Sequence, residues 1–583
     1  MACINVLVGQ CGNQLGATLF NALSREAAGT PEDESYQTNV STTFFREATK
    51  SERRAAAASA PSSSNIDLPI PRAVLVDMES KVVSQSLSSK KTDNNTKRYT
   101  FTPNQCVTRE EGSANNWACG YFHQGPSRIE AIGEAIRREV EGTDSVGVFH
   151  VMHSLAGGTG SGVGCLTSDC LRTMFPKAIL LHTAVLPYSH GETATQWYNS
   201  VLSYSTLHET ADGIHLMSNG DVALALEASK NATREGKQGG GSDVLSQHQR
   251  GGARRSTVSS NNNRVSLQDI NNVMADTLAS LLLPSHLMAP IAPVDSRMGG
   301  GGSGASRRYH GGGGADSRSK QQQPSTVDII RPRFLSDIVE LVAADPARKF
   351  FESSSYPRAL GSLSAHLKNA RWPHCVSEAL RGTSWGRFAA RCPQLINDPS
   401  AIPMGMSMPF PTDRYAVVLR GATALPTKAS PITQSASSSS QQQTVCGYEE
   451  LRTAVHSLAS SPQFQSVVKT HCPFADVFGD FTSSFTPHGV FAQPTSFHNE
   501  AAHVTLFHTS QSVGQRIAFA TSKAEKMFNE RAFLHHYERY GIEGEDMEGA
   551  LAACWHVARA YNAPAILEEE YSDDDVDVGD DQQ

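Results

Sequence analysis

The sequence predicts an α/β protein with a doubly wound, mainly parallel sheet. Short apolar runs rich in β-forming residues recur along the chain and alternate with segments of helical periodicity. Several of these runs end in turns of glycine and small polar residues. In such folds ligands bind beyond the carboxyl ends of the strands, so these turns are the first candidates for a site.

The most informative segment is Val146–Phe175. It begins with a predicted strand, continues through a turn at Ser154–Gly162 (SLAGGTGSG), and ends in a predicted helix from Val163 onward. This order places backbone N–H groups and a helix N-terminus around a phosphate. The turn has neither GxxxxGK[ST] nor GxGxxG. A phosphate would therefore rest on backbone amides, the hydroxyls of Thr159 and Ser161, the helix dipole and a metal, with an ordinary loop as the alternative.

The chain opens with a similar unit. A strand at Ile4–Val8 precedes a predicted loop at Gly9–Gly16 (GQCGNQLG), and a helix follows through Leu23. The amides of Gln10 and Asn13 can donate hydrogen bonds to oxyanions.

Two further strand ends carry polar residues. The strand Ala73–Val76 runs into Asp77 and Glu79, a spacing that suits a hydrated Mg²⁺ beside phosphates, although two solvated turn acids are the alternative. The strand Leu180–Pro187 leads to Glu192, a candidate acceptor for a ribose hydroxyl. Two more candidate site segments are the small-residue turn Gly112–Trp117 (GSANNW) and the strand-like segment that leads from Ile214 to Asn219.

The length of 583 residues allows two or three domains, and the charged content of 19% points to polar insertions. We expect residues 1–293 to form the nucleotide-binding domain with a core helix at Ser266–Leu283, 326–520 an α+β middle domain, and 521–567 a hairpin of two terminal helices. Insertions without order are expected near 49–65, 230–263, 294–325 and 425–443, and the tail is 568–583.

Composition and charge give further expectations about the partners and location of the protein. The segment Glu568–Asp581 contains nine acids and no base, and the net charge of the whole chain is −8. The rest of the chain is therefore nearly neutral, and the end is a polyanion. Such a segment serves as an interaction tail or merely aids solubility. We expect no nucleic-acid partner, no membrane span and no secretory signal. The 11 cysteines form no CxxC pair, which favours reduced thiols inside the cell.

These segments together resemble tubulin in their order and rough spacing. The matching motifs are GQCGNQLG, RAVLVDME, GSANNWACGY, AGGTGSG, QWYNSVL and RAFLHHY. Within the family the delta branch is the most similar, through IPRAVLVDM, GET at 191–193, DIN at 269–271 and HYERYGIEGED.

The resemblance implies GTP or GDP with Mg²⁺ held by Asp77 and Glu79. Leu267 takes the place of a usual aromatic against the base, which loses ring stacking but keeps an apolar lid. Ala156 replaces a glycine common in the family. The implied nucleotide-binding residues are Gln10, Cys11, Asn115, Ser154, Gly157, Gly158, Thr159, Gly160, Ser161, Glu192, Asn219, Leu267 and Asn271.

Tubulin-like hydrolysis is completed by an acid of the next subunit. Arg333–Val342 (RFLSDIVELV) lies where the resemblance places that acid, with Asp337 and Glu340 in a DxxE arrangement. Glu340 would position water, and Asp337 would support it or the metal. The alternative is that Glu340 is merely a surface residue of an i,i+3 pair.

The expected function is therefore a GTP-binding cytoskeletal subunit with a possible GTPase activity completed in trans. The resemblance implies other tubulins (alpha/beta or minor forms) and centriole or basal-body components as partners. It also implies a role in triplet microtubules beneath cilia or flagella, in the cytoplasm and cytoskeleton. The main alternative is a nucleotide-gated binding protein that never polymerises, and a dinucleotide-dependent enzyme is disfavoured because GxGxxG is missing.

Overall fold

The structure is a computed structural model. It describes residues 1–29, 34–59, 68–88, 98–188, 193–227, 265–288, 329–356, 379, 414–420, 489–493 and 503–561. The predicted insertions at 230–263, 294–325 and 425–443, the tail 568–583 and Glu192 lie outside these ranges.

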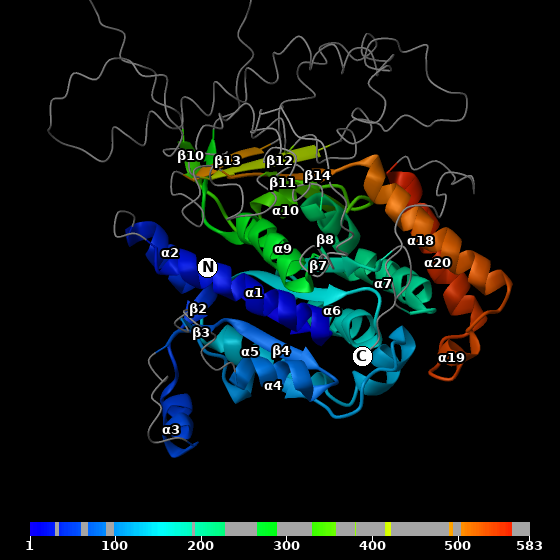
Figure 1. The fold of residues 1–583 in the computed structure, drawn as a ribbon, viewed down its shortest axis with the longest axis horizontal. Coiled ribbons are helices and arrows are strands. Elements are labelled where there is room, and N and C mark those ends of the chain that lie inside the picture. Colours follow the sequence, from blue (N-terminus) through cyan, green and yellow to red (C-terminus); the bar gives the residue numbers. More distant parts are fainter. Residues whose placement is uncertain are drawn as a thin grey trace, which may run out of the picture.

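A single sheet of 12 strands runs through the described part of the molecule in the order β10-β9-β13-β12-β14-β11-β8-β7-β6-β1-β4-β5 (Figure 1). The strands are β1 Ala2–Val8, β4 Ala73–Asp77, β5 Cys106–Thr108, β6 Val146–Ser154, β7 Ile179–Leu186, β8 Gly213–Ser218, β9 His286–Met288, β10 Ile329–Pro332, β11 Phe350–Tyr356, β12 Arg414–Arg420, β13 Gly489–Gln493 and β14 His503–Thr509. Two short strands, β2 Phe45–Arg46 and β3 Ile70–Pro71, pair separately.

The sheet changes character at β11. Every pairing from β5 through β4, β1, β6, β7 and β8 to β11 is parallel. On its other edge β11 pairs antiparallel with β14, and β14 pairs antiparallel with β12. The expected nucleotide-binding and middle regions therefore share one continuous sheet.

The helices are α1 Gly9–Ala27, α2 Glu34–Phe44, α3 Lys50–Ser59, α4 Ser80–Ser88, α5 Ile129–Glu141, α6 Gly164–Met174, α7 Gln196–Thr210, α9 Leu267–Leu282, α10 Asp337–Val342, α18 Gln511–Asn529, α19 His535–Glu538 and α20 Gly544–Ala560. A helix also spans 219–227. A 3-10 turn, η2, spans Pro103–Gln105, and two π-helical turns, η3 Cys119–Gln124 and η4 Thr159–Val163, complete the set.

Helices cover both faces of the parallel strands, which confirms the doubly wound α/β prediction. Successive side chains of a strand point to opposite faces, and β1 divides its apolar residues accordingly. Cys3 and Leu7 pack in the core beneath α1, α2 and α9, whereas Ile4, Val6 and Val8 pack in the core beneath α5 and α6. A further core joins α7 to α18 and α20, which lie side by side at one end of the molecule (Figure 1).

Three local predictions were wrong. Gly9–Gly16 is not a loop, because α1 begins at Gly9 directly after β1. The glycine turn after β6 is shorter than predicted, because the chain is already helical from Thr159. Lys50–Ser59 forms the helix α3 instead of part of a disordered insertion.

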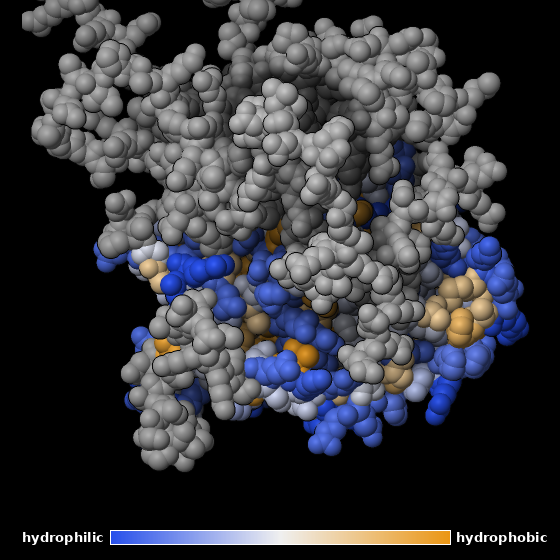
Figure 2. Space-filling view, in the orientation of Figure 1, coloured by the Kyte–Doolittle hydropathy of each residue, from blue (hydrophilic) through white to orange (hydrophobic). Residues whose placement is uncertain are grey.

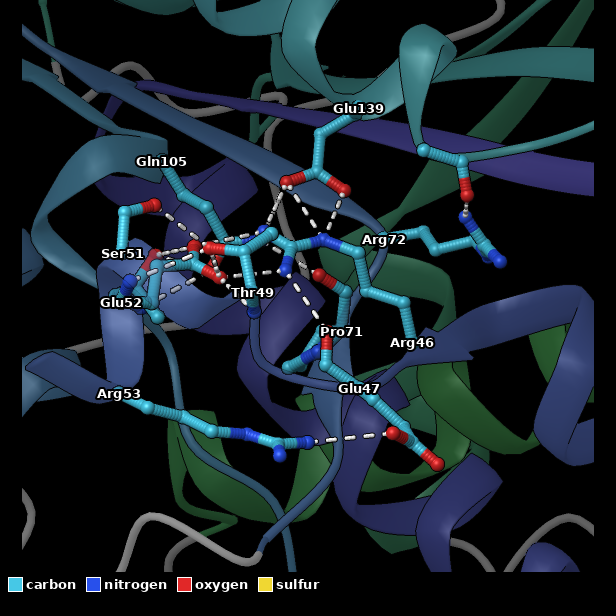
Figure 3. A network of polar contacts seen from close by, with 12 residues as sticks. Arg46, Glu47, Thr49, Ser51, Glu52, Arg53, Pro71, Arg72, Gln105 and Glu139 are labelled. Atoms are coloured by element: carbon cyan, nitrogen blue, oxygen red, sulfur yellow. Dashed lines mark hydrogen bonds and ion pairs between the residues drawn. The ribbon is translucent and has the colours of Figure 1, made fainter.

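The ion-pair network in Figure 3 holds the helix α3 in place. The Arg46 guanidinium donates to Glu52 at the start of α3 (Nη1–Oε2 2.9 Å) and to Glu139 of α5 (Nη2–Oε1 2.8 Å). Burial alone would raise the pKa of Glu52, but hydrogen bonds from Arg46 and Thr49 lower it to about 2. Gln105 also donates to Glu139 at 3.1 Å. The helix is therefore fastened to the domain at its first turn.

The described surface on the face seen in Figure 2 is mostly hydrophilic, with a small hydrophobic patch on the side of α18–α20. None of the described helices is both long and apolar enough to span a membrane.

Candidate functional site

Several of the predicted site residues gather at one edge of the sheet. Because β1, β4, β6, β7 and β8 are parallel, their carboxyl ends share that edge. Gln10 and Cys11 follow β1, Asp77 ends β4, Ser154 ends β6, and Asn219 follows β8.

Two helices begin at this edge without a side-chain cap. The residue before α1 is Val8 and the residue before η4 is Gly158, and neither offers an acceptor to the first-turn N–H groups. Gly9 adopts a φ of +71°, and a Cβ there would lie 3.0 Å from the Gly160 nitrogen, so the two helix starts touch backbone to backbone. Uncapped first turns in this arrangement are chemically suited to an anion.

The glycine loop is close-packed and not flexible. A Cβ on Gly160 would lie 2.8 Å from the Ser154 carbonyl oxygen, and a Cβ on Gly158 or Gly162 would collide with backbone of the 113–121 segment. Gly157 differs, because a Cβ there would meet only the Asn115 Oδ1, at an ordinary 3.6 Å. The open side of the loop is therefore at Gly157, facing the turn 112–117.

Some predicted polar groups are already engaged within the fold. The Asn13 side chain donates to the carbonyls of Gly9 (2.9 Å) and Val76 (3.1 Å), so its N–H groups are not free for an anion. The Ser161 hydroxyl donates to the Gly157 carbonyl. Thr159 and Ser113 share a hydroxyl–hydroxyl hydrogen bond of 3.0 Å, which joins the glycine loop to the turn 112–117.

The turn 112–117 depends on two residues in the left-handed region. Ala114 and Asn115 both have φ near +49°, which is unusual for residues other than glycine. The Asn115 carbonyl accepts hydrogen bonds from Asn199 Nδ2 (2.9 Å) and Thr195 Oγ1 (3.1 Å). Its side chain remains on the exposed side of the turn, opposite Gly157.

The two acids predicted to hold a metal differ in exposure. Asp77 is buried, and burial raises the pKa of its carboxyl to about 6, an effect partly offset by a hydrogen bond from the Glu79 N–H (3.2 Å). Glu79 is exposed beside Gly112. No group of three His, Cys, Asp or Glu side chains within the described ranges could hold a metal ion.

These two carboxyls nevertheless fit a hydrated magnesium ion. Mg²⁺ is commonly bound through one or two carboxylates, waters and substrate phosphates. A buried carboxylate whose surroundings raise its pKa would also be stabilised by a nearby divalent cation. Asp77 and Glu79 would therefore supply the protein's share of such a site, beside the two helix starts.

The residues expected on the base side occupy two helix beginnings. Asn219 starts the helix after β8, Leu267 is the first residue of α9 with 59% of its surface exposed, and Asn271 lies one turn further on. No hydrogen bond engages the side chain of Asn219 or Asn271 in the described structure, so both amides remain available.

The DxxE pair divides into a buried and an exposed acid. Asp337 is 5% exposed and accepts a 2.8 Å hydrogen bond from the Phe334 N–H, which stabilises the start of α10. Glu340 is exposed on the same helix. Only Glu340 therefore presents its carboxylate at the surface.

Sequence reasoning missed one residue at the centre of the site, Asn199 of α7. Its four hydrogen bonds join Asn115, Ala156, Trp117 and Tyr537. The motif QWYNSVL contains it, but a single asparagine inside a helical pattern carries no signal of such a position.

Known proteins are similar in sequence to this part of the chain. Residues 2–224 match the Tubulin/FtsZ family, GTPase domain. The chain is 36% identical to the human tubulin delta chain over 225 residues, 38% of this chain and 46% of that relative. It is 30% identical to the mouse tubulin delta chain over 292 residues (49% and 53%), and 34% identical to the mouse tubulin epsilon chain over 234 residues (40% and 47%).

The chain thus spans about half the length of the curated relatives it matches. The match covers β1 through β8, the strands whose carboxyl ends carry the glycine loop and the two uncapped helix starts. Residues 2–224 belong to the GTPase domain of the Tubulin/FtsZ family.

Proposed function

We propose that this protein binds GTP and GDP with Mg²⁺ at the carboxyl edge of the parallel strands. The observation that carries the proposal is the pair of helix starts, α1 and η4, that touch at Gly9 and Gly160 without side-chain caps. Two such first turns present N–H groups and the positive ends of helix dipoles to one anion. The match of this region to a GTPase domain supports guanine as the base.

We assign roles to the other predicted site residues relative to this anion position. Gln10, Cys11 and the loop Gly157–Ser161 would contact the phosphates, and Asp77 and Glu79 would hold the metal. The unbonded amides of Asn219 and Asn271 suit the hydrogen-bonding edge of guanine. Leu267 would cover the base. Glu192 lies outside the described residues, and only the resemblance to tubulin assigns it to the ribose.

Hydrolysis would be completed by a second subunit. Glu340 is exposed on α10, and a carboxylate ionised at pH 7 can orient water or accept its proton. It would act on the nucleotide of the subunit against which it packs. Asp337 is buried at the start of the helix and would support α10 without touching the nucleotide.

The cellular role we propose is that of a delta-like tubulin in the centriole or basal body. There it would help assemble or maintain triplet microtubules, with other tubulins as partners. The similarity to tubulin delta chains favours this role. A non-polymerising, nucleotide-gated binding protein is the second candidate, and electron microscopy of the protein mixed with alpha/beta subunits distinguishes the two.

Gly157 offers a direct test of the site. A Cβ there meets no backbone, in contrast to Gly160, so Gly157→Leu should fold with its bulk on the open side of the loop, where we expect it to obstruct the nucleotide. Gly549→Leu on α20, where a Cβ would enter open space, is the matched control.

The measurements are chromatography of the nucleotide that co-purifies and the affinity for fluorescent GDP with Mg²⁺. We expect guanine nucleotide in wild type and in Gly549→Leu, and a loss of at least about 100-fold in affinity for Gly157→Leu, a steric exclusion far larger than the roughly tenfold loss of one hydrogen bond. A folded Gly157→Leu protein with wild-type affinity would show that the site lies elsewhere.

A further inference from the structure

The segment between α18 and α20 contacts the proposed nucleotide loops through one buried side chain. Asn199 is completely buried, and its amide uses its full hydrogen-bonding capacity. The Nδ2 group donates to the carbonyls of Asn115 (2.9 Å) and Ala156 (2.7 Å), and Oδ1 accepts from the Trp117 N–H (2.8 Å) and the Tyr537 hydroxyl (2.6 Å).

These four partners come from separate parts of the chain. Asn115 and Trp117 belong to the turn that faces Gly157, and Ala156 belongs to the loop after β6. Tyr537 lies on α19, more than 300 residues further along the chain, and is itself completely buried. A second hydrogen bond, from Asn116 Nδ2 to the His536 carbonyl (3.2 Å), joins the same two segments.

The backbone of both segments is strained. Among the described residues, the non-glycine residues with positive φ are Ala114 and Asn115 in the turn, and Arg531 and Phe533 just before α19. Such conformations persist only where surrounding contacts hold them, and they concentrate at functional sites. Here the two strained segments are fastened to each other, so a shift in one changes the hydrogen-bond geometry of the other.

We propose that Tyr537 is a positioning residue for the nucleotide site, acting through Asn199 on the turn 112–117 and the loop after β6. The proposal rests on the proposed guanine-nucleotide function. Bound nucleotide holds the loops in the arrangement that Asn199 requires, and this in turn orders the 530–540 segment. Because coupling between two sites is reciprocal, anything that displaces the 530–540 segment weakens nucleotide binding by the same factor.

A matched pair of tyrosines separates this coupling from ordinary packing. Tyr198 and Tyr537 are both completely buried, and their rings meet edge to face at 5.3 Å. The Tyr537 hydroxyl donates to Asn199 Oδ1 at 2.6 Å and also lies 3.2 Å from the Thr195 carbonyl. The Tyr198 hydroxyl donates to the Ala532 carbonyl (3.1 Å), not to Asn199. Tyr198→Phe and Tyr537→Phe therefore each remove one hydroxyl from the same cluster, but only Tyr537→Phe removes a partner of Asn199.

The experiment uses the full-length chain with methylanthraniloyl-GDP and Mg²⁺. We expect both variants to melt alike. Tyr537→Phe should weaken binding about 3- to 10-fold, the effect of losing one hydrogen bond, while Tyr198→Phe should stay within about 1.5-fold of wild type. Hydrogen–deuterium exchange supplies a second measurement: GDP should slow exchange in 530–540 in wild type and in Tyr198→Phe, but not in Tyr537→Phe.

Each outcome decides a separate question. A wild-type protein that binds no guanine nucleotide would refute the proposed function. Wild-type binding with equal affinities of the two variants, or with exchange in 530–540 unaffected by GDP, would overturn the role of Tyr537 and leave the nucleotide site standing. If Tyr537→Phe does not fold, the exchange measurement on wild type alone decides.

Discussion

Mild acid should destabilise this protein strongly, because four histidines are buried in the central strands. His150 and His153 lie on β6, His182 on β7 and His215 on β8, each at most 1% exposed. Burial lowers their pKa values to about 3 for His150 and His215 and about 4 for His153, and lowers that of His182 well below 6.5.

Hydrogen bonds suited to neutral rings hold this cluster. His153 Nε2 lies 3.0 Å from His182 Nδ1, and His182 Nε2 lies 3.0 Å from the Ser168 hydroxyl. His150 bonds to Asn5 at 3.1 Å and to Thr183 at 2.8 Å. In the His153–His182 hydrogen bond one ring donates and the other accepts. Protonation of the accepting ring would place two N–H donors against each other. Protonation of the donating ring would place a charge in the interior.

The pH dependence follows from the difference between folded and unfolded states. Below pH 6.5, the pKa of histidine in the unfolded chain, the unfolded chain binds protons that the folded chain does not. The free energy of unfolding therefore decreases as the pH is lowered. Stability from these groups is complete above 6.5 and is lost progressively down to pH 3–4. Between pH 7 and 5.5 each histidine should contribute a loss of about 1 kcal/mol, or about 4–5 kcal/mol for the four.

Asp77 acts in the opposite direction. Its folded pKa of about 6 lies above the unfolded value of 3.8, so proton uptake by the folded state returns about 1 kcal/mol over the same pH range. The net loss of about 4 kcal/mol is a large part of the 5–15 kcal/mol typical of folded proteins.

Urea unfolding followed by circular dichroism at pH 7.0, 6.0 and 5.5 measures this loss. The variant His182→Gln keeps a hydrogen-bonding side chain that does not titrate, and should reduce the pH-dependent loss by about 1 kcal/mol. A wild-type loss below about 1 kcal/mol between pH 7 and 5.5 would refute the reasoning, since the four histidines and Asp77 together predict a loss of about 4 kcal/mol.

Two further predictions use matched pairs of residues. Arg46→Leu leaves the buried carboxylates of Glu52 and Glu139 without their cation, and should cost about 3–5 kcal/mol in urea unfolding, whereas the exposed Arg53→Leu should cost at most about 1 kcal/mol. Equal effects would contradict the network in Figure 3. Glu340→Ala should leave the monomer's melting temperature and GTP affinity unchanged, but slow turnover by about 10²–10⁴ in assemblies where this subunit contacts another nucleotide. Equal turnover in a co-assembly verified by microscopy would make Glu340 an ordinary surface acid.

Local patterns were sufficient for several elements of the fold. The segments that form β1, β4, β6 and β7 are apolar and rich in β-forming residues, and these strands formed where they were predicted. The core helix α9 formed where it was predicted, and a Ser266–Asp269 capping box begins it. Such features depend on neighbours within a few residues, so a single sequence contains them.

Other elements depended on contacts far along the chain. Gly9–Gly16 contains three glycines and resembles a loop, yet it is helical, and Gly12 packs directly against the Met152 carbonyl of β6. The Ala-rich segment of α3 resembles an insertion, yet Glu52 anchors it to Arg46 and Glu139. In both cases the stabilising partner is remote in sequence, so no local pattern records it.

For the site, the residue types at the strand ends could be read directly from the amino-acid order: the glycine loop, the turn 112–117, and the acids Asp77 and Glu79. The tertiary structure alone decided which polar groups stay available, because burial and hydrogen bonding are set by segments that meet only in the folded chain. It buried Asp337 while leaving Glu340 exposed, and it brought Tyr537 onto Asn199 behind the nucleotide loops.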